Sequence, residues 1–430
     1  MTLKDCRSYL ERVEVYGIKF GLDNIRAVLD DLKNPERHFP SVLVAGTNGK
    51  GSVCAMLAEV FLRHGLRVGL YTSPHLVSVE ERIRLDRRPI PPRDFCRLLS
   101  RVKDSCDRLL EAGTLSEPLT YFEHLTALAF LYFQEKKVDL AVLEVGMGGR
   151  FDATNVVTPL VSVITSIGLD HQKYLGPTIG RIAFEKAGII KPGVPVVCAP
   201  DGGAAYRTIR KRAREMGAPF VGVFDPPAVL RVTKGTAGYR FVYRRAGRTY
   251  RFNPRLAGKH QGRNAATAIT VASVLSRTWR KVEPGKLLAG IRQADWPGRL
   301  EVLGRKPLVM LDGAHNEEGA SALAAYIRDF MPKPVSLVFA VMRDKDIRPI
   351  VRKLFPPARR IILTTIPMHR AAAPEEVLAQ AGLFRKKTIL EPDLERALAV
   401  AKALALKAKG SVLVAGSLFL VGECKKLSRR

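Results

Sequence analysis

The stretch Ser41-Val-Leu-Val-Ala-Gly-Thr-Asn-Gly-Lys-Gly-Ser52 decides how this sequence is interpreted. Its first five residues are mostly apolar and predict a buried strand over 41–45, and apolar residues at helical spacing predict a helix over 50–64. Glycines between them let the backbone curl so that successive N–H groups face one anion, while the helix N-terminus adds partial positive charge. The stretch therefore predicts a phosphate-binding loop.

This loop departs from the common P-loop spacing at two positions. Val44 stands where a glycine is usual, and Gly51 stands where Ser or Thr usually follows the lysine. Lys50 can still reach the β- and γ-phosphates, and Ser52 supplies a hydroxyl for Mg²⁺. The alternative is a plain glycine turn entering a helix. The flanking strand and helix, with a lysine and a serine in place, favour the phosphate loop.

Strand-like apolar runs alternate with helical patterns along most of the chain. Beyond the loop we expect strands at 67–71, 138–144 and 161–164 and an apolar helix at 122–133. Buried continuous strands separated by helices are typical of a parallel, doubly wound sheet. The predicted fold class is therefore α/β, with a large P-loop-type domain.

Two further segments complete the predicted architecture. Short β-rich pieces with Lys-Gly and Ala-Gly turns predict a small antiparallel meander between about 219 and 254. A turn signal, Trp296-Pro-Gly298, precedes a second strand–helix series, which predicts a smaller, Rossmann-like C-terminal α/β domain. We expect domains at 1–297 and 298–430. The expected strands cover 228–232, 239–243 and 249–252 in the meander and 307–311, 335–340, 360–364 and 411–415 in the second domain.

Composition limits the class of protein. Of the 430 residues 47% are hydrophobic and 26% are charged, which is ordinary for a globular chain and excludes overall disorder. No apolar run approaches the ~18 residues of a membrane span, and the first residues lack the apolar core of a secretory signal. The six cysteines form no Cys-x-x-Cys pair. We therefore expect a reduced, cytoplasmic protein that has no membrane partner and is a monomer.

The net charge of 70 − 41 = +29 predicts affinity for anions without saying which. It leaves a nucleic-acid-binding P-loop ATPase as an alternative of a different class. Against that alternative, the sequence has no aromatic and basic strand pattern and no nucleic-acid module. We interpret the basic clusters at 207–214, 244–245 and 425–430 as solvated surface and expect no nucleic-acid partner.

Glu144 is the first candidate metal ligand outside the loop. It ends the strand expected at 138–144 and is followed by Gly146-Met-Gly-Gly149. A carboxylate at the carboxyl end of a buried parallel strand, beside a phosphate loop, is where a magnesium ligand belongs. Alone, such a residue is more often a cap or a solvated side chain, but its pairing with the loop favours the metal.

Eight motifs occur along the chain in a fixed order, and together they carry a family resemblance. They are Gly46-Thr-Asn-Gly-Lys-Gly-Ser52, Tyr71-Thr-Ser-Pro-His-Leu76, Glu144-Val-Gly-Met-Gly-Gly-Arg-Phe-Asp-Ala-Thr-Asn155, Thr165-Ser-Ile-Gly-Leu-Asp-His171, Glu185-Lys-Ala-Gly188, His260-Gln-Gly-Arg-Asn-Ala-Ala266, Trp296-Pro-Gly-Arg-Leu-Glu301 and Asp312-Gly-Ala-His-Asn316. The chain resembles the folylpolyglutamate synthase/dihydrofolate synthase family, a branch of the Mur-type ATP-dependent amide ligases. The resemblance covers nearly the whole chain and thins in the meander and between 367 and 392.

The resemblance implies an ATP-dependent ligase that adds L-glutamate to an acid through an acyl phosphate and releases ADP and phosphate. It implies roles for residues of every motif. The implied ATP contacts are Gly46, Thr47, Asn48, Gly49, Lys50, Gly51, Ser52, Asn264, Arg299 and Asp312. The implied ligands of two Mg²⁺ ions are Ser52, Ser73, Glu144, His171 and Lys186, the last as a lysine carbamate. The implied catalytic set is Lys50, Glu144, His171 and Lys186.

The carbamate has a physical reason. Mg²⁺ repels an ammonium group, whereas a lysine carbamate presents an anionic oxygen pair on a long arm. Taken without the motifs, Lys186 is an ordinary helix-surface lysine and His171 a packing or capping histidine. The surrounding motifs favour the metal roles for both.

The acid that is activated is either dihydropteroate or a folate that already bears glutamate. Leu119-Thr-Tyr-Phe-Glu123 resembles the form of this segment in bifunctional members, so we expect both activities. Phe122 could stack on a pterin or belong to the core, and Asp152 could bind the pterin or hold a turn. His315 follows an apolar strand, in a turn suited to binding folate or glutamate. A sibling ligase that acts on another acid, such as a peptidoglycan precursor, is the alternative within this class.

Overall fold

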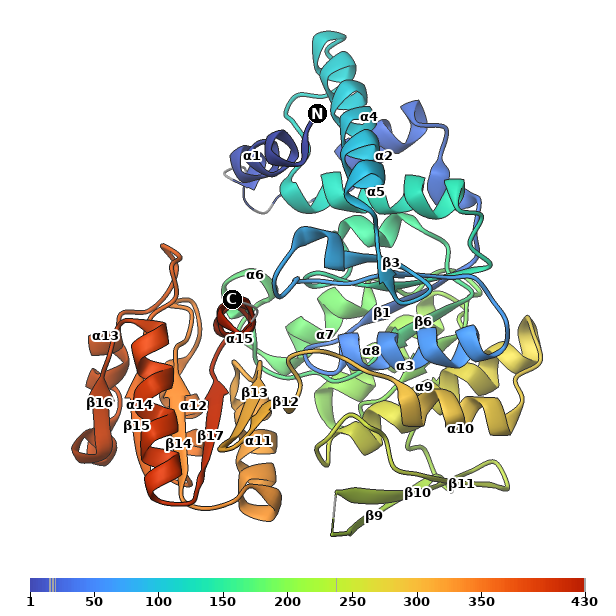
Figure 1. Ribbon diagram of the computed structural model, residues 1–430. Coiled ribbons are helices and arrows are strands. Elements are labelled where there is room, and N and C mark those ends of the chain that lie inside the picture. Colours follow the sequence, from blue (N-terminus) through green and yellow to red (C-terminus); the bar gives the residue numbers. More distant parts are fainter. Residues whose placement is uncertain (15–16, 18, 20, 237, 429–430) are drawn as a thin grey trace.

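The structure is a computed structural model that describes residues 1–14, 17, 19, 21–236 and 238–428. Figure 1 shows a larger α/β domain built from the first two thirds of the chain and a smaller α/β domain beside it. The predicted fold class is therefore confirmed. The chain passes from one domain to the other through the segment between α10 (Pro284–Gln293) and β12 (Glu301–Arg305), which contains Trp296-Pro-Gly298.

An eight-stranded sheet forms the centre of the large domain. Its strand order is β4-β3-β2-β5-β1-β6-β7-β8, and the last six strands in this order, β2-β5-β1-β6-β7-β8, run parallel. Two short antiparallel strands, which the sequence pattern did not predict, extend the β2 edge. The strand bounds are β1 Ser41–Ala45, β2 Val68–Tyr71, β3 Ile83–Leu85, β4 Arg88–Pro89, β5 Leu140–Glu144, β6 Val161–Ile164, β7 Val196–Cys198 and β8 Phe220–Gly222.

Helices cover both faces of this sheet, because the central strands are buried along their whole length and need an apolar layer on each side. One core packs α1, α2, α4 and α5 against the sheet, and the other packs α3, α9 and α10 against the opposite face. The bounds are α1 Leu3–Glu14, α2 Asp23–Asp31, η1 Pro35–Arg37, α3 Lys50–Arg63, η2 Val79–Arg82, α4 Pro92–Glu111, α5 Tyr121–Glu135, η3 Ala153–Val156, α6 Gln172–Leu175, α7 Ile179–Ala187, α8 Gly203–Glu215 and α9 Gln261–Thr278.

The meander forms a separate three-stranded antiparallel sheet of β9 (Val229–Lys234), β10 (Tyr239–Arg245) and β11 (Arg248–Phe252). Alternate residues of β10 and β11, among them Phe241 and Tyr250, are buried in the core that includes α9 and α10. In the described part of the chain the meander therefore decorates the helical layer and does not pair with the large sheet (Figure 1). It begins later than the predicted residue 219, because β8, at Phe220–Gly222, belongs to the large sheet.

The C-terminal domain has a six-stranded sheet in the order β12-β13-β17-β14-β15-β16, parallel except for β12. Helices α11, α12 and α13 cover one face, and α14 and α15 cover the other. The bounds are β13 Leu308–Asp312, α11 Glu317–Phe330, β14 Val335–Phe339, α12 Ile347–Leu354, β15 Arg360–Leu363, α13 Pro374–Ala379, η4 Gly382–Lys387, β16 Thr388–Leu390, α14 Leu394–Lys407, β17 Ser411–Ala415 and α15 Leu418–Leu427. We propose that the boundary between the two domains lies between residues 297 and 298.

Helix α15 lies at the junction of the two domains (Figure 1). At Gly422 a Cβ atom would stand 2.0 Å from the carbonyl oxygen of Leu76, which belongs to the large domain. A side chain at this position would therefore push α15 away from the loop that contains Ser73. The close approach fixes how the second domain faces the first.

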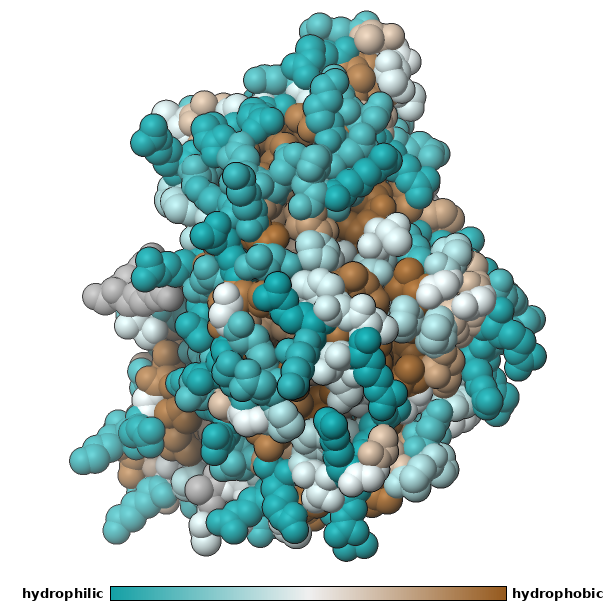
Figure 2. Space-filling model, turned by 90° about the vertical axis from the view of Figure 1, so that its right-hand side faces the viewer, coloured by the Kyte–Doolittle hydropathy of each residue, from teal (hydrophilic) through white to brown (hydrophobic). Residues whose placement is uncertain are grey.

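The face shown in Figure 2 is mostly covered by hydrophilic side chains, and hydrophobic residues show only in patches between them. Within the described part of the chain, no helix is long and apolar enough to cross a membrane. The six cysteines are buried thiols without disulfide bonds.

Candidate active site

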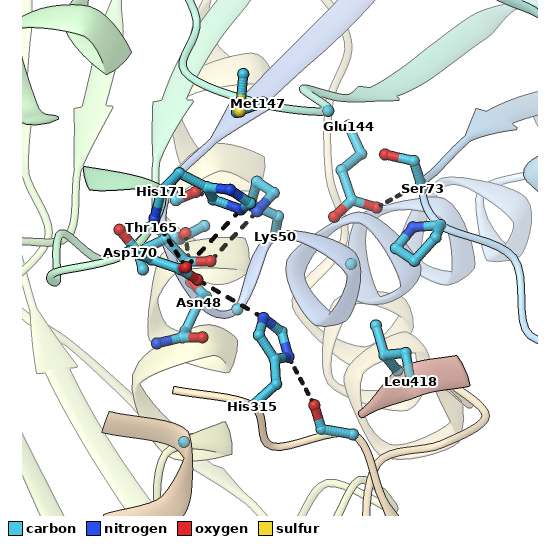
Figure 3. A pocket seen from close by; sticks show the side chains of 18 of the residues that line it. Asn48, Lys50, Ser73, Glu144, Met147, Thr165, Asp170, His171, His315 and Leu418 are labelled. Carbon is cyan, nitrogen blue, oxygen red and sulfur yellow. Dashed lines mark hydrogen bonds and ion pairs between the residues drawn. The ribbon is translucent and has the colours of Figure 1, made fainter. Parts of the chain in front are cut away.

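A cleft of about 660 Å³ lies between the two domains. Every residue that the sequence predicted for the site lines this cleft, from the phosphate loop to His315. Figure 3 shows Lys50, Glu144, His171 and His315 around one space, although they come from four segments of the chain. The structure thus brings the predicted residues together.

The phosphate loop follows β1 at the carboxyl edge of the large sheet. Val44 pairs with Glu144 in the parallel register of β1 and β5, so the loop and the Glu144 carboxylate leave the sheet side by side. Gly49 precedes α3 with φ of 86°, and a Cβ atom there would stand 2.4 Å from Oδ1 of Asn264. Only glycine fits this turn, which explains its place in the motif.

Lys50 and Ser52 have different hydrogen-bond partners around the loop. Lys50 Nζ donates hydrogen bonds to the carbonyl oxygens of Gly46 at 3.1 Å and Thr47 at 3.3 Å. Ser52 is buried, and its Oγ accepts a hydrogen bond from Nε2 of Gln261 at 3.3 Å. The lysine is folded over the loop, where its charge faces the place that a phosphate would take.

Glu144 is almost fully buried, and the backbone N–H of Ser73 donates to its Oε2 at 3.2 Å. Burial raises the pKa of Glu144, and the neighbouring cation of Lys50 opposes this rise. A buried carboxylate of this kind is costly unless a cation neutralises it. The site therefore suits a divalent cation between Glu144 and the loop.

Lys186 is only 4% exposed, and its Nζ donates to the carbonyl oxygen of Gly46 at 2.9 Å. The turn after Glu144 packs on α7, where the N–H of Arg150 donates to the carbonyl oxygen of Glu185 at 2.9 Å. This packing places the Lys186 side chain against the phosphate loop. Burial, assisted by the charge of Lys50, lowers the pKa of Lys186 to about 7.

His171 is the residue directly before α6, with φ of 51°, and its side chain is 37% exposed. Its backbone N–H donates to Oδ1 of Asp170 at 2.9 Å. The ring faces the same space as Lys50 (Figure 3). Among the described residues, no three His, Cys, Asp or Glu side chains form a metal-binding group. The predicted metal set, which mixes Glu144 and His171 with two serines and a carbamate, stays a prediction.

Phe122 and Asp152 lie in the part of the cleft formed by α5 and the Gly146–Gly149 turn. The Phe122 ring is partly buried and packs at 5.7 Å from that of Tyr71. Asp152 is buried, and its carboxylate accepts hydrogen bonds from the N–H groups of Met147 and Thr154, each at 3.0 Å. Asp152 therefore holds the turn, and a pterin that bound to its carboxylate would do so beside these two backbone N–H groups.

The C-terminal domain contributes Arg299, Asp312 and His315. Asp312 is buried, and its carboxylate accepts from the N–H groups of Leu300 and Ala314, each at 2.9 Å. Burial raises the pKa of Asp312, while Arg299 opposes the rise. The Nδ1 atom of His315 contacts the carbonyl oxygen of Gly313 at 2.8 Å, and its Nε2 lies 3.6 Å from Asp170. Asp312 thus ties together the segment before β12, which presents Arg299, and the loop after β13, which presents His315.

Asp170 and Lys345 are among the residues of the cleft that were not predicted from the sequence. Lys345 Nζ donates to Oδ1 of Asp170 at 2.8 Å across the domain interface. Asp170 stands inside the Thr165–His171 motif, beside a residue that was predicted. Lys345 lies in a charged segment that no recognised motif includes, so nothing in the sequence marked it.

Comparison with known proteins defines the class first. The family model of the Mur ligase middle domain matches residues 44–272, and the family model of the Mur ligase, glutamate ligase domain matches residues 298–418. The first match alone covers more than half of the chain. The chain therefore belongs to the Mur ligase family.

Relatives define the branch of this family. The chain is 36% identical to the dihydrofolate synthase/folylpolyglutamate synthase of Bacillus subtilis over 98% of both chains, and 36% identical to the folylpolyglutamate synthase of Lacticaseibacillus casei over 82% of both. Mycobacterium tuberculosis folylpolyglutamate synthase complexed with ADP and AMPPCP superposes with a TM-score of 0.92, at 32% identity, over 100% of this chain and 99% of that one. E. coli FolC in complex with DHPP and ADP gives a TM-score of 0.86, at 29% identity, over 99% and 97%. This chain belongs to the dihydrofolate synthase/folylpolyglutamate synthase family.

Proposed function

We propose that this protein is an ATP-dependent ligase that joins L-glutamate to dihydropteroate and to folates that already bear glutamate. The observation that carries the proposal is the interdomain cleft, in which the phosphate loop, the Glu144 carboxylate and the folate-side residues Phe122 and Asp152 meet. The names of relatives that cover nearly the whole chain support both activities. ADP in the related solved structures supports the nucleotide.

The reaction has two balanced steps. A carboxylate oxygen of the acid attacks the γ-phosphorus of ATP, the bond to the β-phosphate oxygen breaks, and ADP leaves. The glutamate amine then attacks the carbonyl carbon of the acyl phosphate, phosphate leaves, and the nitrogen loses a proton. Phosphoryl transfer depends mainly on positioning and charge neutralisation. A cleft with Lys50 on one wall and Arg299 on the other meets both needs.

In this proposal the phosphate loop binds the β- and γ-phosphates through its amides and Lys50, while Asn264 and Arg299 contact the nucleotide from the other walls. Phe122 and Asp152 bind the pterin end of the acid. His315 faces glutamate from the C-terminal domain. Closing the cleft excludes water, which would otherwise hydrolyse the acyl phosphate.

Magnesium fits the donors that line the cleft. Glu144 supplies a buried carboxylate that accepts a hydrogen bond from the N–H of Ser73, and Ser52 supplies a hydroxyl. When bound, Mg²⁺ neutralises the charge that develops on the transferring phosphoryl group. We assign Ser52, Ser73, Glu144, His171 and Lys186 to two ions by the family resemblance.

Carbamylation of Lys186 is part of the proposal. Only a neutral amine reacts with carbon dioxide, and a lysine whose pKa is about 7 is neutral in a large fraction of molecules at physiological pH. The buried Nζ beside the phosphate loop also places the product near the expected metals.

The buried free thiols agree with the cytoplasm as the proposed compartment.

An assay with both acceptors tests the function. We expect ADP and phosphate to form in the presence of glutamate together with either dihydropteroate or a reduced folate, with one amide bond formed per ADP. ADP formation with a muramyl-peptide precursor instead would assign the chain to a sibling ligase. Stimulation by DNA or RNA without any response to folates would favour the nucleic-acid ATPase.

A further inference from the structure

A network of polar contacts joins the two domains beside the phosphate loop. We call it the interdomain latch. Its members are Asn48 and Asp170 from the large domain and Asn316, Glu318 and Lys345 from the C-terminal domain. Figure 3 shows the members Asn48 and Asp170, together with the contact of Asp170 with His315 of the C-terminal domain. Asp170 accepts hydrogen bonds from Lys345 Nζ at 2.8 Å and from Asn316 Nδ2 at 3.1 Å.

The ion pair in the latch is buried. The side chains of Asp170 and Lys345 are 8% and 10% exposed, although they lie 175 residues apart in the chain. A buried ion pair adds little net stability, but leaving one partner alone and buried is strongly unfavourable. In the closed arrangement each charge depends on the other, so loss of either partner would leave a lone buried charge and favour domain opening, which returns that charge to water.

Asn48 connects the latch to the phosphate loop itself. Its Nδ2 donates to Glu318 at 2.7 Å, and its Oδ1 accepts from Asn316 Nδ2 at 3.0 Å. Its backbone N–H donates to Ser166 Oγ at 3.0 Å within the large domain. The segment that would bind phosphate is thus held directly by the start of α11. Nucleotide binding and domain closure are therefore linked, and such linkage is reciprocal.

We propose that Asp170 and Lys345 are positioning residues, whose pairing holds the C-terminal domain closed on the nucleotide-loaded phosphate loop. The inference rests on the proposed ligase function. A closed cleft protects the acyl phosphate from water until the glutamate amine attacks. A loosened latch would let water compete, so ADP would form without a matching amount of amide product.

Two substitutions on the C-terminal domain test the latch without changing the segment next to His171. Lys345→Met removes the charge but keeps an unbranched chain. In the structure, Asn316 Oδ1 caps α11 by accepting from the N–H of Gly319. Asn316→Ser removes the amide group that donates to Asp170 but keeps a side-chain oxygen that can cap the helix. The matched control is Lys353→Met, because Lys353 is exposed and pairs with Glu317 at 3.7 Å within the same domain.

The measurements are X-ray scattering with saturating ADP and the ratio of ADP to amide product. We expect both latch variants to give a larger radius of gyration with ADP than the wild type, a KM for ATP about tenfold higher, and a ratio clearly above one. The control should match the wild type. Wild-type compaction and a ratio of one in both variants would overturn the inference. If Lys345→Met does not fold, Asn316→Ser decides alone.

Asp170→Asn separates the latch from a direct contact between Lys345 and phosphate. If Lys345 acts through Asp170, this variant uncouples ADP formation as Lys345→Met does. If only Lys345→Met uncouples it, Lys345 acts on the nucleotide and the latch is wrong. Absence of ligation by the wild type with every acceptor would refute the proposed function, and the scattering experiment would still test the latch because it needs only ADP.

Discussion

The two walls of the cleft are built in different ways. The large-domain wall comes from the ends of adjacent parallel strands, where Val44 and Glu144 are paired neighbours and Lys186 hydrogen-bonds to the loop from below. The C-terminal wall comes from loops after β13 and β14, and it reaches the first wall through Asn316 and Lys345. The first wall exists within one domain, whereas the second belongs to the site only when the domains are closed.

This difference separates two kinds of effect. Changes in those residues of the large-domain wall that line the phosphate and metal site, such as Glu144 and Lys186, should remove the chemistry itself and lower kcat. Changes in the C-terminal wall should disturb closure and act on KM and on the coupling of ADP release to ligation. A substitution that violates this division would break the comparison.

Glu144→Gln should have the largest effect. The amide keeps the size of the side chain but removes the charge that the buried position holds for a cation. We expect kcat to fall about 10³-fold, the loss typical for an electrostatic group at a reacting centre. Steady-state kinetics and an unchanged circular dichroism spectrum check this expectation. Glu317→Gln, on the exposed start of α11, is the control, and a kcat near the wild-type value for Glu144→Gln would remove Glu144 from the metal site.

Lys186→Met should follow. The methionine fills the buried position but cannot form a carbamate, so we expect kcat to fall about 10²-fold. Wild-type protein stripped of carbon dioxide should lose activity and regain it when bicarbonate is added. The variant should not respond to bicarbonate. Full activity of Lys186→Met, or a stripped wild type that stays active, would contradict the carbamate.

The stability of the large domain should depend on pH through His124, which joins α1 to α5. Its Nε2 contacts the hydroxyl of Tyr9 at 2.8 Å, and its Nδ1 contacts the carbonyl oxygen of Thr120 at 3.0 Å. Burial lowers the pKa of His124 to about 4. Between that value and the unfolded pKa of about 6.5 the unfolded chain binds more protons, so acidification destabilises the fold.

We expect the His124 contribution to remove about 2 kcal/mol from the free energy of unfolding between pH 7 and pH 5. Urea unfolding followed by tryptophan fluorescence measures it, because Trp279 and Trp296 both precede the second domain's sheet. His124→Gln cannot gain a proton and should show a correspondingly weaker dependence on pH. An identical pH dependence in the variant would exclude His124 as its source.

The sequence predicted the first wall better than the second, and the reason is physical. Strands β1 and β6 begin and end where the apolar runs do, because buried parallel strands leave an unbroken apolar pattern. Strands β3, β4, β7, β8, β12 and β16 were missed, since strands of two or three residues or at a sheet edge carry little pattern.

The site shows the same limit. A motif read along the chain finds residues that share a loop, such as Lys50 and Ser52. It does not find Lys345, whose partner Asp170 lies in another domain. Nor does it show that the Asp152 and Asp312 carboxylates are already bonded to backbone N–H groups. The roles assigned to individual residues remain predictions that the substitutions above decide.

Asp312→Asn should have the smallest effect and sharpens the comparison most. An asparagine keeps one oxygen to accept a hydrogen bond but turns an NH₂ group toward the second N–H, so either Leu300 or Ala314 loses its partner. Loss of the Leu300 partner would shift the segment before β12 and move Arg299 away from the cleft, and loss of the Ala314 partner would shift the loop between β13 and α11 and move His315. Since these residues belong to the closing wall, we expect KM for ATP to rise about tenfold while kcat changes less, which corresponds to about 1.4 kcal/mol. Asp346→Asn, on an exposed position of the same domain, serves as the control. A loss of kcat as large as that of Glu144→Gln, with KM unchanged, would mean that Asp312 takes part in the chemistry and that the two walls do not divide the work as their construction indicates.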